Sequence, residues 1–357
     1  MSKDKVRLGF VGTGGMGQMA HLRNYSLLPD CEVVAVSETR EGLGARVAAR
    51  YGVPKVYPDA AAMLAHEKLD GLVASQPFWR HGIVVNELLR TGLPLFIEKP
   101  LAGTLPVAEQ LEAADRAAGG KIMIGYHKRS DPATIYAKAE IDRLKQTGEL
   151  GKLRYVRVTM PSGDWVANGW LGALDAPRPD LVVDPEDPGL DPASRKAFFE
   201  FVNFYIHQIN LIRHLAGENY RLSYVDPTGV VITGNGLVSG VPVVLEACPY
   251  TSPSDWQESA LVAFEYGFVQ LRLPAPLAFN RPGHVEVYRD PPVSRTDGRP
   301  AGGSTTIPEL PWDHAMRVQA QNFIKFCRGE APPPCGAAEA AEDIRIARSW
   351  LKITRGV

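Results

Sequence analysis

The sequence has few cysteines, no long apolar run and no excess of charge of one sign. Its four cysteines, at positions 31, 248, 327 and 335, show neither the spacing of zinc ligands nor that of a disulfide framework. No apolar run approaches the ~20 residues that cross a bilayer, and the first five residues lack the apolar core of an export signal. We therefore expect a cytoplasmic protein with no metal site and no membrane partner.

The charges nearly balance, because 39 lysines and arginines face 40 aspartates and glutamates. The sequence contains no basic stripe and no cluster of aromatic and basic residues, so we do not expect a nucleic-acid partner. A hydrophobic share of 45% and a charged share of 22% are typical of globular proteins. A chain of 357 residues exceeds one typical domain, and two domains are expected.

The first 127 residues alternate between short apolar runs and helical patterns. The runs cover residues 6–11, 32–37, 69–74, 95–98 and 121–125; the helical patterns follow the first run as far as residue 28 and then cover residues 41–51, 81–91 and 107–118. Continuous apolar strands separated by helices indicate βαβ units and a parallel sheet buried on both faces. We predict an α/β Rossmann domain with a doubly wound parallel sheet over residues 1–127.

Residues 128–357 have a different pattern and are predicted to form a second domain. Helical patterns cover residues 133–146 and 197–216 and two closing segments; strand-like runs cover 153–160, 221–225, 242–250, 259–273 and 284–290; Pro/Gly-rich stretches cover 161–192 and 291–311. Runs of strands beside a few helices indicate an α+β domain with an open, largely antiparallel sheet. The stretch 161–192 either encloses a substrate or is a surface insertion or an oligomer contact.

A glycine-rich loop, Gly12-Thr13-Gly14-Gly15-Met16-Gly17, follows the first predicted strand and opens the first helix. Here Gly12 permits a tight turn, Gly14 lets the backbone approach a pyrophosphate, and Gly17 lets the helix pack closely on the strand. The N-terminus of the helix also favours the phosphate charge. The whole loop, with Gly15 and Met16, is predicted to bind a dinucleotide; the alternative is a turn without a ligand.

An acidic residue, Glu38, stands at the end of the second predicted strand, about 20 residues beyond the last glycine. A carboxylate in this position binds the hydroxyls of the adenosine ribose and repels a 2′-phosphate, which favours NAD. Arg40 is also assigned to the cofactor site, and it leaves NADP open because an arginine nearby can accept that phosphate.

Polar side chains also follow the third and fourth predicted strands. Gln76 and Pro77 are expected along the cofactor, because ligands bind beyond the carboxyl ends of parallel strands. His81 is grouped with them, although we expect it to cap or pack the next helix rather than transfer protons. Glu98 and Lys99 complete this group. Lys99 can donate a hydrogen bond to a substrate oxygen and stabilise developing negative charge; the alternative is a structural Glu98–Lys99 ion pair.

Several motifs, in the same order along the chain, resemble those of the glucose-fructose oxidoreductase / inositol dehydrogenase / rhizopine-catabolism (Gfo/Idh/MocA) family. Besides the glycine loop, they are Pro77-x-x-x-His81, Glu98-Lys99-Pro100-Leu101-Ala102, Gly125-Tyr126-x-x-Arg129-x-x-Pro132, Gly148-Glu149-Leu150-Gly151 and Ala347-Arg348-Ser349. The resemblance implies a Rossmann domain joined to a domain whose open sheet carries substrate residues and often mediates oligomerisation. It also implies hydride transfer at a sugar or cyclitol hydroxyl, with Lys99 near the reacting oxygen.

The predicted helix over residues 198–215 is apolar on almost every side, which is typical of a buried helix. Asn203, His207 and Asn210 share one face of it, at spacings of four and three residues. The family commonly has an aspartate, a histidine and a second aspartate at this spacing, so both acids are replaced here. His207 is therefore the expected general base or acid, with Lys99 polarising the oxygen; the alternative is a core histidine. Asn203 can orient the ring or bind a hydroxyl.

Further substrate residues are expected at the end of the last Rossmann strand and in the long Pro/Gly-rich stretch. Tyr126, His127 and Arg129 should face the nicotinamide side, although the family often has an asparagine in place of His127. Arg129 either binds substrate or ties the domains together. Trp165 is either an aromatic platform for a sugar ring or a packing anchor.

Three functions are compatible with the sequence. The first is an NAD-dependent dehydrogenase that transfers hydride between a sugar, sugar-derivative or cyclitol hydroxyl and nicotinamide. The second is an NAD-retaining enzyme that uses transient oxidation to cleave a glycoside. The third is a catalytically inactive dinucleotide-binding sensor, which the two asparagine replacements favour. The resemblance also predicts a homodimer or homotetramer formed through the C-terminal sheet.

Overall fold

A computed structural model describes residues 4–292 and 302–357, which divide into two compact units. Unit 1 comprises residues 1–127, 168–203 and 316–345, and unit 2 comprises residues 128–167, 204–315 and 346–357. The first boundary follows His127, but the expected second domain of residues 128–357 does not coincide with unit 2. Helix α8 (Ala315–Cys327) explains part of this difference, because Phe323 and Ile324 are buried in the same core as the first strands.

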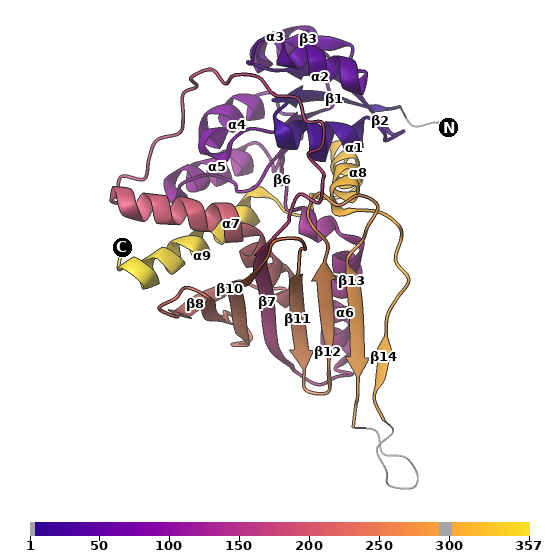
Figure 1. The fold of residues 1–357 in the computed structure, drawn as a ribbon, viewed down its shortest axis with the longest axis vertical. Coiled ribbons are helices and arrows are strands. Elements are labelled where there is room, and N and C mark those ends of the chain that lie inside the picture. The colour runs from indigo at the N-terminus through magenta and orange to yellow at the C-terminus, as the bar shows by residue number, and fades with distance from the viewer. Residues whose placement is uncertain (1–3, 293–301) are drawn as a thin grey trace. The chain divides into compact units, whose positions relative to one another are not determined.

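Unit 1 contains a six-stranded parallel sheet whose strand order is β3-β2-β1-β4-β5-β6. Of these strands, β1, β2, β3 and β6 are labelled in Figure 1. The strands are β1 (Val6–Val11), β2 (Cys31–Ser37), β3 (Lys55–Tyr57), β4 (Gly71–Ala74), β5 (Leu95–Ile97) and β6 (Ile122–Ile124). This order is that of a Rossmann fold, so the predicted α/β doubly wound architecture is confirmed. The four central strands, β2, β1, β4 and β5, are buried almost throughout, as their continuous apolar runs predict.

Within residues 4–127, helices connect these parallel strands. They are a π-helical turn at Gly17–Leu22 continued by α1 (Arg23–Tyr25), α2 (Leu43–Tyr51), α3 (Ala60–His66), α4 (His81–Leu89) and α5 (Leu105–Ala117). The sequence did not predict β3 or α3. Strand β3 is only three residues long and carries a lysine and a tyrosine at the edge of the sheet, so it lacks the apolar run that marks the central strands.

Unit 2 contains an eight-stranded sheet of order β14-β13-β12-β11-β7-β10-β9-β8. The strands are β7 (Leu153–Gly163), β8 (Tyr220–Val225), β9 (Val231–Gly236), β10 (Pro242–Ser252), β11 (Glu258–Phe264), β12 (Gly267–Leu273), β13 (His284–Arg289) and β14 (Ser304–Thr306). Strands β7 and β10 pair in parallel and the other neighbours pair antiparallel, which confirms a largely antiparallel sheet. The predicted single run 259–273 is a hairpin, because the chain turns at Glu265-Tyr266.

Helices accompany the sheet of unit 2. Helix α6 (Pro132–Thr147) packs on β12 and β13. It begins with Asp131, whose side chain accepts a hydrogen bond from the amide of Ala133, and ends at Gly148 with a φ of 68°. Helix α9 (Ala337–Arg355) is shared between the units. Along β11 buried and half-buried residues alternate, as expected for a sheet with one covered face.

Helix α7 (Pro192–Ala216) begins five residues before its predicted start, since Asp191 accepts hydrogen bonds from the amides of Ala193 and Ser194. The expectation that this helix is buried on every side is wrong. Asn203 is exposed and Phe204 is 60% exposed, whereas Val202 and Ile206 are buried. The boundary between the two units falls inside the helix, between Asn203 and Phe204.

Several expectations concern segments without a predicted helix or strand. Residues 164–191 form no helix or strand, as predicted. The second Pro/Gly-rich stretch, 291–311, contains the short strand β14, and its residues 293–301 lie outside the described part of the chain.

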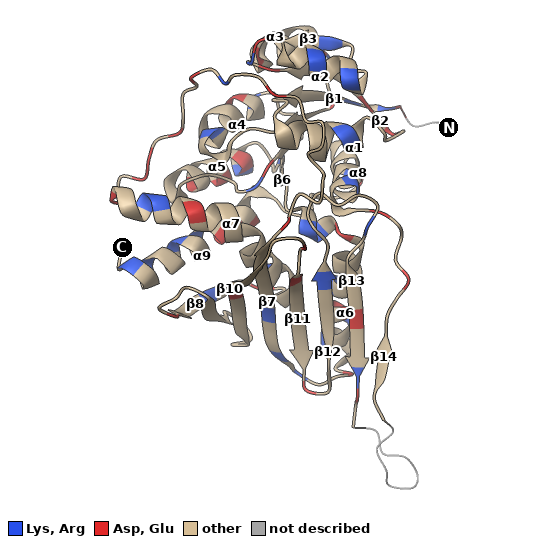
Figure 2. Cartoon of the chain, in the orientation of Figure 1, with Lys and Arg blue, Asp and Glu red and all other residues tan. Residues whose placement is uncertain are grey.

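Within the described residues, no helix is long and apolar enough to span a membrane. Acidic and basic residues are interspersed within each unit (Figure 2).

Candidate cofactor site in unit 1

The glycine loop turns sharply between β1 and the first helix. Gly12 has a φ of 91°, and its amide donates a hydrogen bond to the carbonyl of Ser37 at 2.9 Å. A Cβ atom at Gly12 would lie 2.3 Å from Nε2 of Gln76, and one at Gly17 would lie 2.8 Å from the carbonyl oxygen of Gly12. Both positions therefore require glycine, one for the turn and one for close packing of helix against strand.

Gly14, Gly15 and Met16 lead into the first turn of the helix and are half-buried. A Cβ atom at Gly14 would come within 4 Å of only Arg40 among the described residues, and one at Gly15 would meet the indole of Trp170 at 3.4 Å. The backbone at Gly14 thus carries no side chain where a pyrophosphate would approach, and the first amides of a helix are suited to bind it. The loop fits the phosphates of a dinucleotide.

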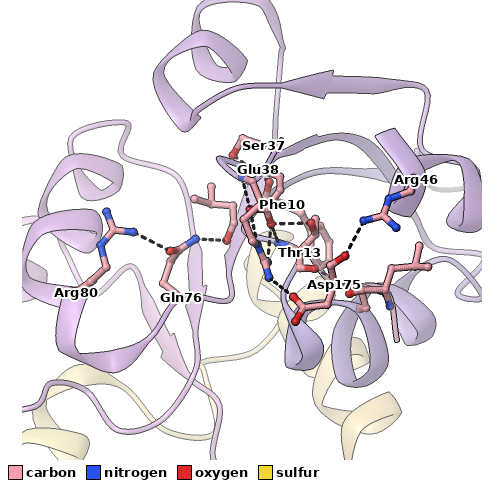
Figure 3. Close-up of polar contacts among 12 residues, drawn as sticks. Phe10, Thr13, Ser37, Glu38, Arg46, Gln76, Arg80 and Asp175 are labelled. Carbon is pink, nitrogen blue, oxygen red and sulfur yellow. Dashed lines mark hydrogen bonds and ion pairs between the residues drawn. The ribbon is translucent and has the colours of Figure 1, made fainter. Parts of the chain in front are cut away.

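Glu38, at the end of β2, is bound to the glycine loop and to Arg40 (Figure 3). Its Oε2 accepts hydrogen bonds from the amide and the hydroxyl of Thr13, both at 2.8 Å, and from NH2 of Arg40 at 2.9 Å. Its Oε1 accepts from the amide and from Nε of Arg40, at 2.9 and 3.0 Å. A carboxylate has about four lone-pair sites, so a ribose hydroxyl can join this group only by sharing or replacing a donor.

The surroundings of Glu38 keep it ionised. Burial raises its pKa, but the hydrogen bonds from Arg40 and Thr13 outweigh burial and bring the pKa to about 2, below the ordinary 4.5. A folded-state pKa below the unfolded value means stability that is present above pH 4.5 and is lost as the pH falls toward 2. The carboxylate is therefore an anion at every physiological pH.

We expect Glu38→Gln to lower the free energy of unfolding at pH 7 by roughly 2 kcal/mol. The difference from the unchanged protein should shrink as the pH is lowered below about 4.5, where the protein begins to lose this contribution. Urea unfolding curves between pH 7 and about pH 2 measure both effects. Glu41→Gln, at an exposed position three residues further on, is the matched control. A constant difference at all these pH values would contradict the assigned ionisation.

The segment after β4 holds Gln76, Pro77 and His81 together. Nε2 of Gln76 donates to the carbonyl of Val11 at 3.0 Å, and its Oε1 accepts from NH1 of Arg80 at 3.4 Å. His81 is buried; its Nδ1 lies 3.1 Å from the carbonyl of Leu101 and its Nε2 lies 3.3 Å from that of Gln76. Burial lowers the pKa of His81 and outweighs these hydrogen bonds. This ring packs against backbone at the start of α4, so its influence on a cofactor would pass through Gln76.

Glu98 and Lys99, for which a structural ion pair was the alternative, each have a further partner. Glu98 is buried and its Oε1 lies 2.7 Å from Nε2 of His21, while its Oε2 accepts from the amide of Lys99 at 3.1 Å. Burial raises the pKa of Glu98, but the contacts with His21 and Lys99 together hold it below its ordinary value. Lys99 is followed by a cis peptide bond to Pro100, and its Nζ donates to the backbone carbonyl of Asn203 at 3.1 Å. No local pattern indicates this histidine partner, which lies 77 residues from the acid.

The remaining predicted residues fall in different parts of the two units. Tyr126 and His127 are buried at the end of unit 1. In unit 2, Nε of Arg129 donates to Oδ1 of Asn210 at 2.7 Å, and both side chains are buried. This contact explains why a polar residue stands at position 210. His207 is half-buried, one helical turn beyond Asn203 on α7.

Trp165 is 38% exposed, and its carbonyl accepts a hydrogen bond from the amide of Leu277 at 3.4 Å. The adjacent Asp164 accepts from the amides of Val166 and Ala167 with the same oxygen, Oδ1, which shapes the local turn. The backbone of Trp165 is thus held within unit 2.

A segment of the first Pro/Gly-rich stretch lies against the glycine loop, and these contacts were not predicted from the sequence. We call residues 170–176, which belong to unit 1, the strap. Trp170 packs on Gly15, the backbone of Leu174 pairs with the side chain of Gln18, and Asp175 binds Arg40. These partners are more than 120 residues apart in sequence, and no short-range pattern identifies such pairs.

The N-terminal part of the chain matches a family of known proteins. Residues 6–126 fit the model of the GFO_IDH_MocA family, described as an oxidoreductase family with an NAD-binding Rossmann fold. An inositol 2-dehydrogenase from Acidothermus cellulolyticus is 29% identical over 143 residues, which are 40% of this chain and 42% of that protein. A scyllo-inositol 2-dehydrogenase (NAD(+)) from Bacillus subtilis is 28% identical over 154 residues, 43% of this chain and 44% of that protein. The chain thus spans about two fifths of the length of these curated relatives.

A solved structure extends the likeness of fold to the whole chain. The apo scyllo-inositol dehydrogenase from Lactobacillus casei aligns with a TM-score of 0.68 and 15% identity, covering 100% of this chain and 98% of that one. The fold of both units is therefore shared with a known dehydrogenase structure.

Proposed function

Because the chain belongs to the Gfo/Idh/MocA oxidoreductase family, we propose that it is an NAD-dependent dehydrogenase acting on a hydroxyl group of a sugar, sugar derivative or cyclitol. One observation carries the choice of cofactor: an ionised Glu38 at the end of β2, joined to the glycine loop through Thr13. An anion in this position favours the ribose hydroxyls of NAD over the 2′-phosphate of NADP. The names of the two inositol dehydrogenase relatives support the substrate class.

Bound NAD⁺ would supply the hydride acceptor. In this proposal the Gly12–Gly17 loop, including Gly14, Gly15 and Met16, holds the pyrophosphate, and Glu38 with Arg40 meets the adenosine ribose. Gln76, Pro77 and His81 border the cofactor after β4, and Glu98 positions Lys99 through its bond to the Lys99 amide. Each assignment follows the rule that ligands of open α/β sheets bind at the carboxyl ends of the strands.

We assign the chemical step to Lys99 and His207. The Lys99 ammonium group donates a hydrogen bond to the substrate oxygen and stabilises the negative charge that develops on it. The imidazole of His207 takes the hydroxyl proton when the alcohol is oxidised and returns it when the carbonyl is reduced. Tyr126, His127, Arg129, Trp165 and Asn203 are proposed as substrate residues.

We expect His207→Ala to lower kcat by roughly 10²–10⁴-fold, because a positioned general base contributes about that much. Affinity for NAD⁺ should stay within about twofold, because no part of the proposed cofactor site is changed. Steady-state kinetics and a separate binding titration measure the two quantities. His284→Ala removes an exposed histidine of β13 in the same unit and is the control. Near-normal turnover of the His207 variant would refute the assignment.

Assembly and location belong to the same proposal. We propose a homodimer or homotetramer in the cytoplasm that contacts its neighbours through the sheet of unit 2, with a small carbohydrate or polyol as substrate and no nucleic-acid or membrane partner. The sheet supports this choice because its residues alternate between buried and half-buried along β11, so one face is less covered than the other. Light scattering of the purified protein tests the assembly, and a monomer at all concentrations would contradict it.

A substrate screen tests the proposed function. Purified protein is incubated with NAD⁺ or NADP⁺ and a panel of cyclitols, sugars, sugar derivatives and glycosides, and both absorbance of the reduced cofactor and product formation are followed. We expect formation of NADH with at least one cyclitol or sugar. Release of a sugar without net NADH would indicate redox-assisted glycoside cleavage instead. Tight dinucleotide binding without turnover on any compound would indicate a sensor.

A further inference from the structure

The strap, residues 170–176, is held against the cofactor loop by several independent contacts within unit 1. The side chain of Gln18 donates from Nε2 to the carbonyl of Leu174 at 2.8 Å and accepts at Oε1 from the amide of Leu174 at 3.0 Å. The same Nε2 also donates to the carbonyl of Thr13 at 2.7 Å. Since Gln18 is completely buried, it couples the position of the strap to that of the glycine loop.

Arginines attach the strap at the other side of the loop. NH1 of Arg40 donates to Oδ1 of Asp175 at 3.1 Å, and NH2 of Arg46 donates to the backbone carbonyl of Asp175 at 2.6 Å (Figure 3). NH1 of Arg50 bonds the carbonyl of Gly172. Arg46 and Arg50 belong to α2, whose basic residues are blue in Figure 2. Of these contacts only the Arg40–Asp175 pair involves a side chain of the strap.

Arg40 consequently lies between two carboxylates. Its Nε and NH2 are bonded to Glu38 and its NH1 to Asp175, and its side chain is only 9% exposed. The triad of Glu38, Arg40 and Asp175 carries a net charge of one negative unit. A guanidinium group used in this way is held away from the bidentate geometry with which it would bind a phosphate.

We propose that Asp175 is a specificity-determining positioning residue of the cofactor site, which acts through Arg40 to exclude the 2′-phosphate of NADP. This inference rests on the proposed function, because it takes the adenosine ribose to bind beside Glu38. Asp175 acts in two ways: it draws the Arg40 guanidinium into pairing with carboxylates, and it adds a second negative charge to the place where the phosphate would have to lie. Arg40 alone leaves both NAD and NADP possible. In this proposal the choice is made by Asp175, which lies 135 positions away in the sequence.

The repulsion between the Asp175 carboxylate and a bound 2′-phosphate is moderate. The Asp175 side chain is 77% exposed, so water and salt screen its charge. We therefore expect Asp175→Asn to lower the ratio of the Kd for NADP⁺ to that for NAD⁺ by roughly 3- to 10-fold at low ionic strength. The change should come from tighter NADP⁺ binding, and it should diminish in about 0.5 M salt.

The experiment is a binding titration with NAD⁺ and with NADP⁺, by calorimetry, so that no substrate is needed. Asp180→Asn makes the same charge change at an exposed position five residues further along the chain, outside the strap, and is the matched control. Asp175→Glu keeps the charge and should retain the preference of the unchanged protein. Melting curves confirm that each variant is folded.

Each outcome bears on the proposal in a defined way. A lowered ratio in Asp175→Asn alone supports it. An equal change in the affinity for both dinucleotides would mean that Asp175 only anchors the strap, and an unchanged ratio would mean that Arg40 is not under its control; either result overturns the inference and leaves the proposed function intact. If the unchanged protein bound neither dinucleotide, the proposed function itself would fail, and the inference with it.

Discussion

Replacing Lys99 by methionine is expected to lower kcat by roughly 10³-fold, which is the effect of removing one well-placed donor to a developing oxyanion. Methionine keeps most of the volume and loses the ammonium group, whose Nζ donates to the carbonyl of Asn203. Affinity for NAD⁺ should change by less than about threefold, because the glycine loop and Glu38 are unaltered. Turnover on a substrate identified in the screen and a separate NAD⁺ titration measure the two quantities.

The control for this variant is Lys196→Met, at an exposed lysine of α7 whose Nζ lies 3.9 Å from Glu200. It removes the same charge from the same unit and should leave kcat within about twofold, since surface ion pairs contribute little. Comparable turnover in the two variants would contradict the role of Lys99. A loss of NAD⁺ binding in Lys99→Met would assign Lys99 to cofactor binding and remove it from the chemical step.

The fold of unit 1 could be predicted from the sequence because its central strands are continuously apolar. Strand β1 was predicted with its observed bounds, and β2 differs by one residue. Such runs are buried on both faces of a parallel sheet, so local composition is sufficient to identify them. Strand β3 was missed because an exposed edge strand has no such composition.

Long-range contacts could not be predicted in the same way. The strap was recognised only as a segment without periodicity, since its role depends on Gln18 meeting Leu174 and on Arg40 meeting Asp175. Neither the chemistry nor the spacing of these residues identifies the pairs before the chain has folded. The same is true of the contact between His21 and Glu98, although His21 lies one turn after Gly17 on a helix whose start was predicted.

Helix α7 shows the opposite error, in which local composition was overinterpreted. Its many aromatic residues suggested burial on all sides, yet Phe204 is 60% exposed. An apolar side chain exposed to solvent is common in proteins, whereas a buried polar group needs a partner. Asn210, buried and bonded to Arg129, is accordingly the more informative residue of the predicted polar face.

Gly12→Ala is expected to have the largest effect on stability, lowering the free energy of unfolding by roughly 3 kcal/mol. The φ of 91° is unfavourable for any residue with a Cβ atom. The added methyl group would also lie 2.3 Å from Nε2 of Gln76 and 2.7 Å from the backbone carbonyl of Ser75. The Gln76 side chain can move, but only by giving up its bond to Val11, and the backbone at Ser75 is held by a hydrogen bond from its amide to the carbonyl of Val11. Melting curves and NAD⁺ titrations measure the loss.

Gly52→Ala separates the two causes, because Gly52 also has a positive φ, 69°, but a Cβ atom there would meet nothing within 4 Å among the described residues. Gly52→Ala should therefore lower the free energy of unfolding only by the cost of a positive φ for alanine, roughly 1 kcal/mol. It should keep the NAD⁺ affinity within about twofold. The additional loss at Gly12 measures how tightly the turn is packed against the segment after β4. Equal effects at the two positions would show that the loop can relax around a side chain. In that case the requirement for glycine at position 12 would come from the backbone alone, and the affinity for NAD⁺ would decide whether the relaxed loop still binds a pyrophosphate.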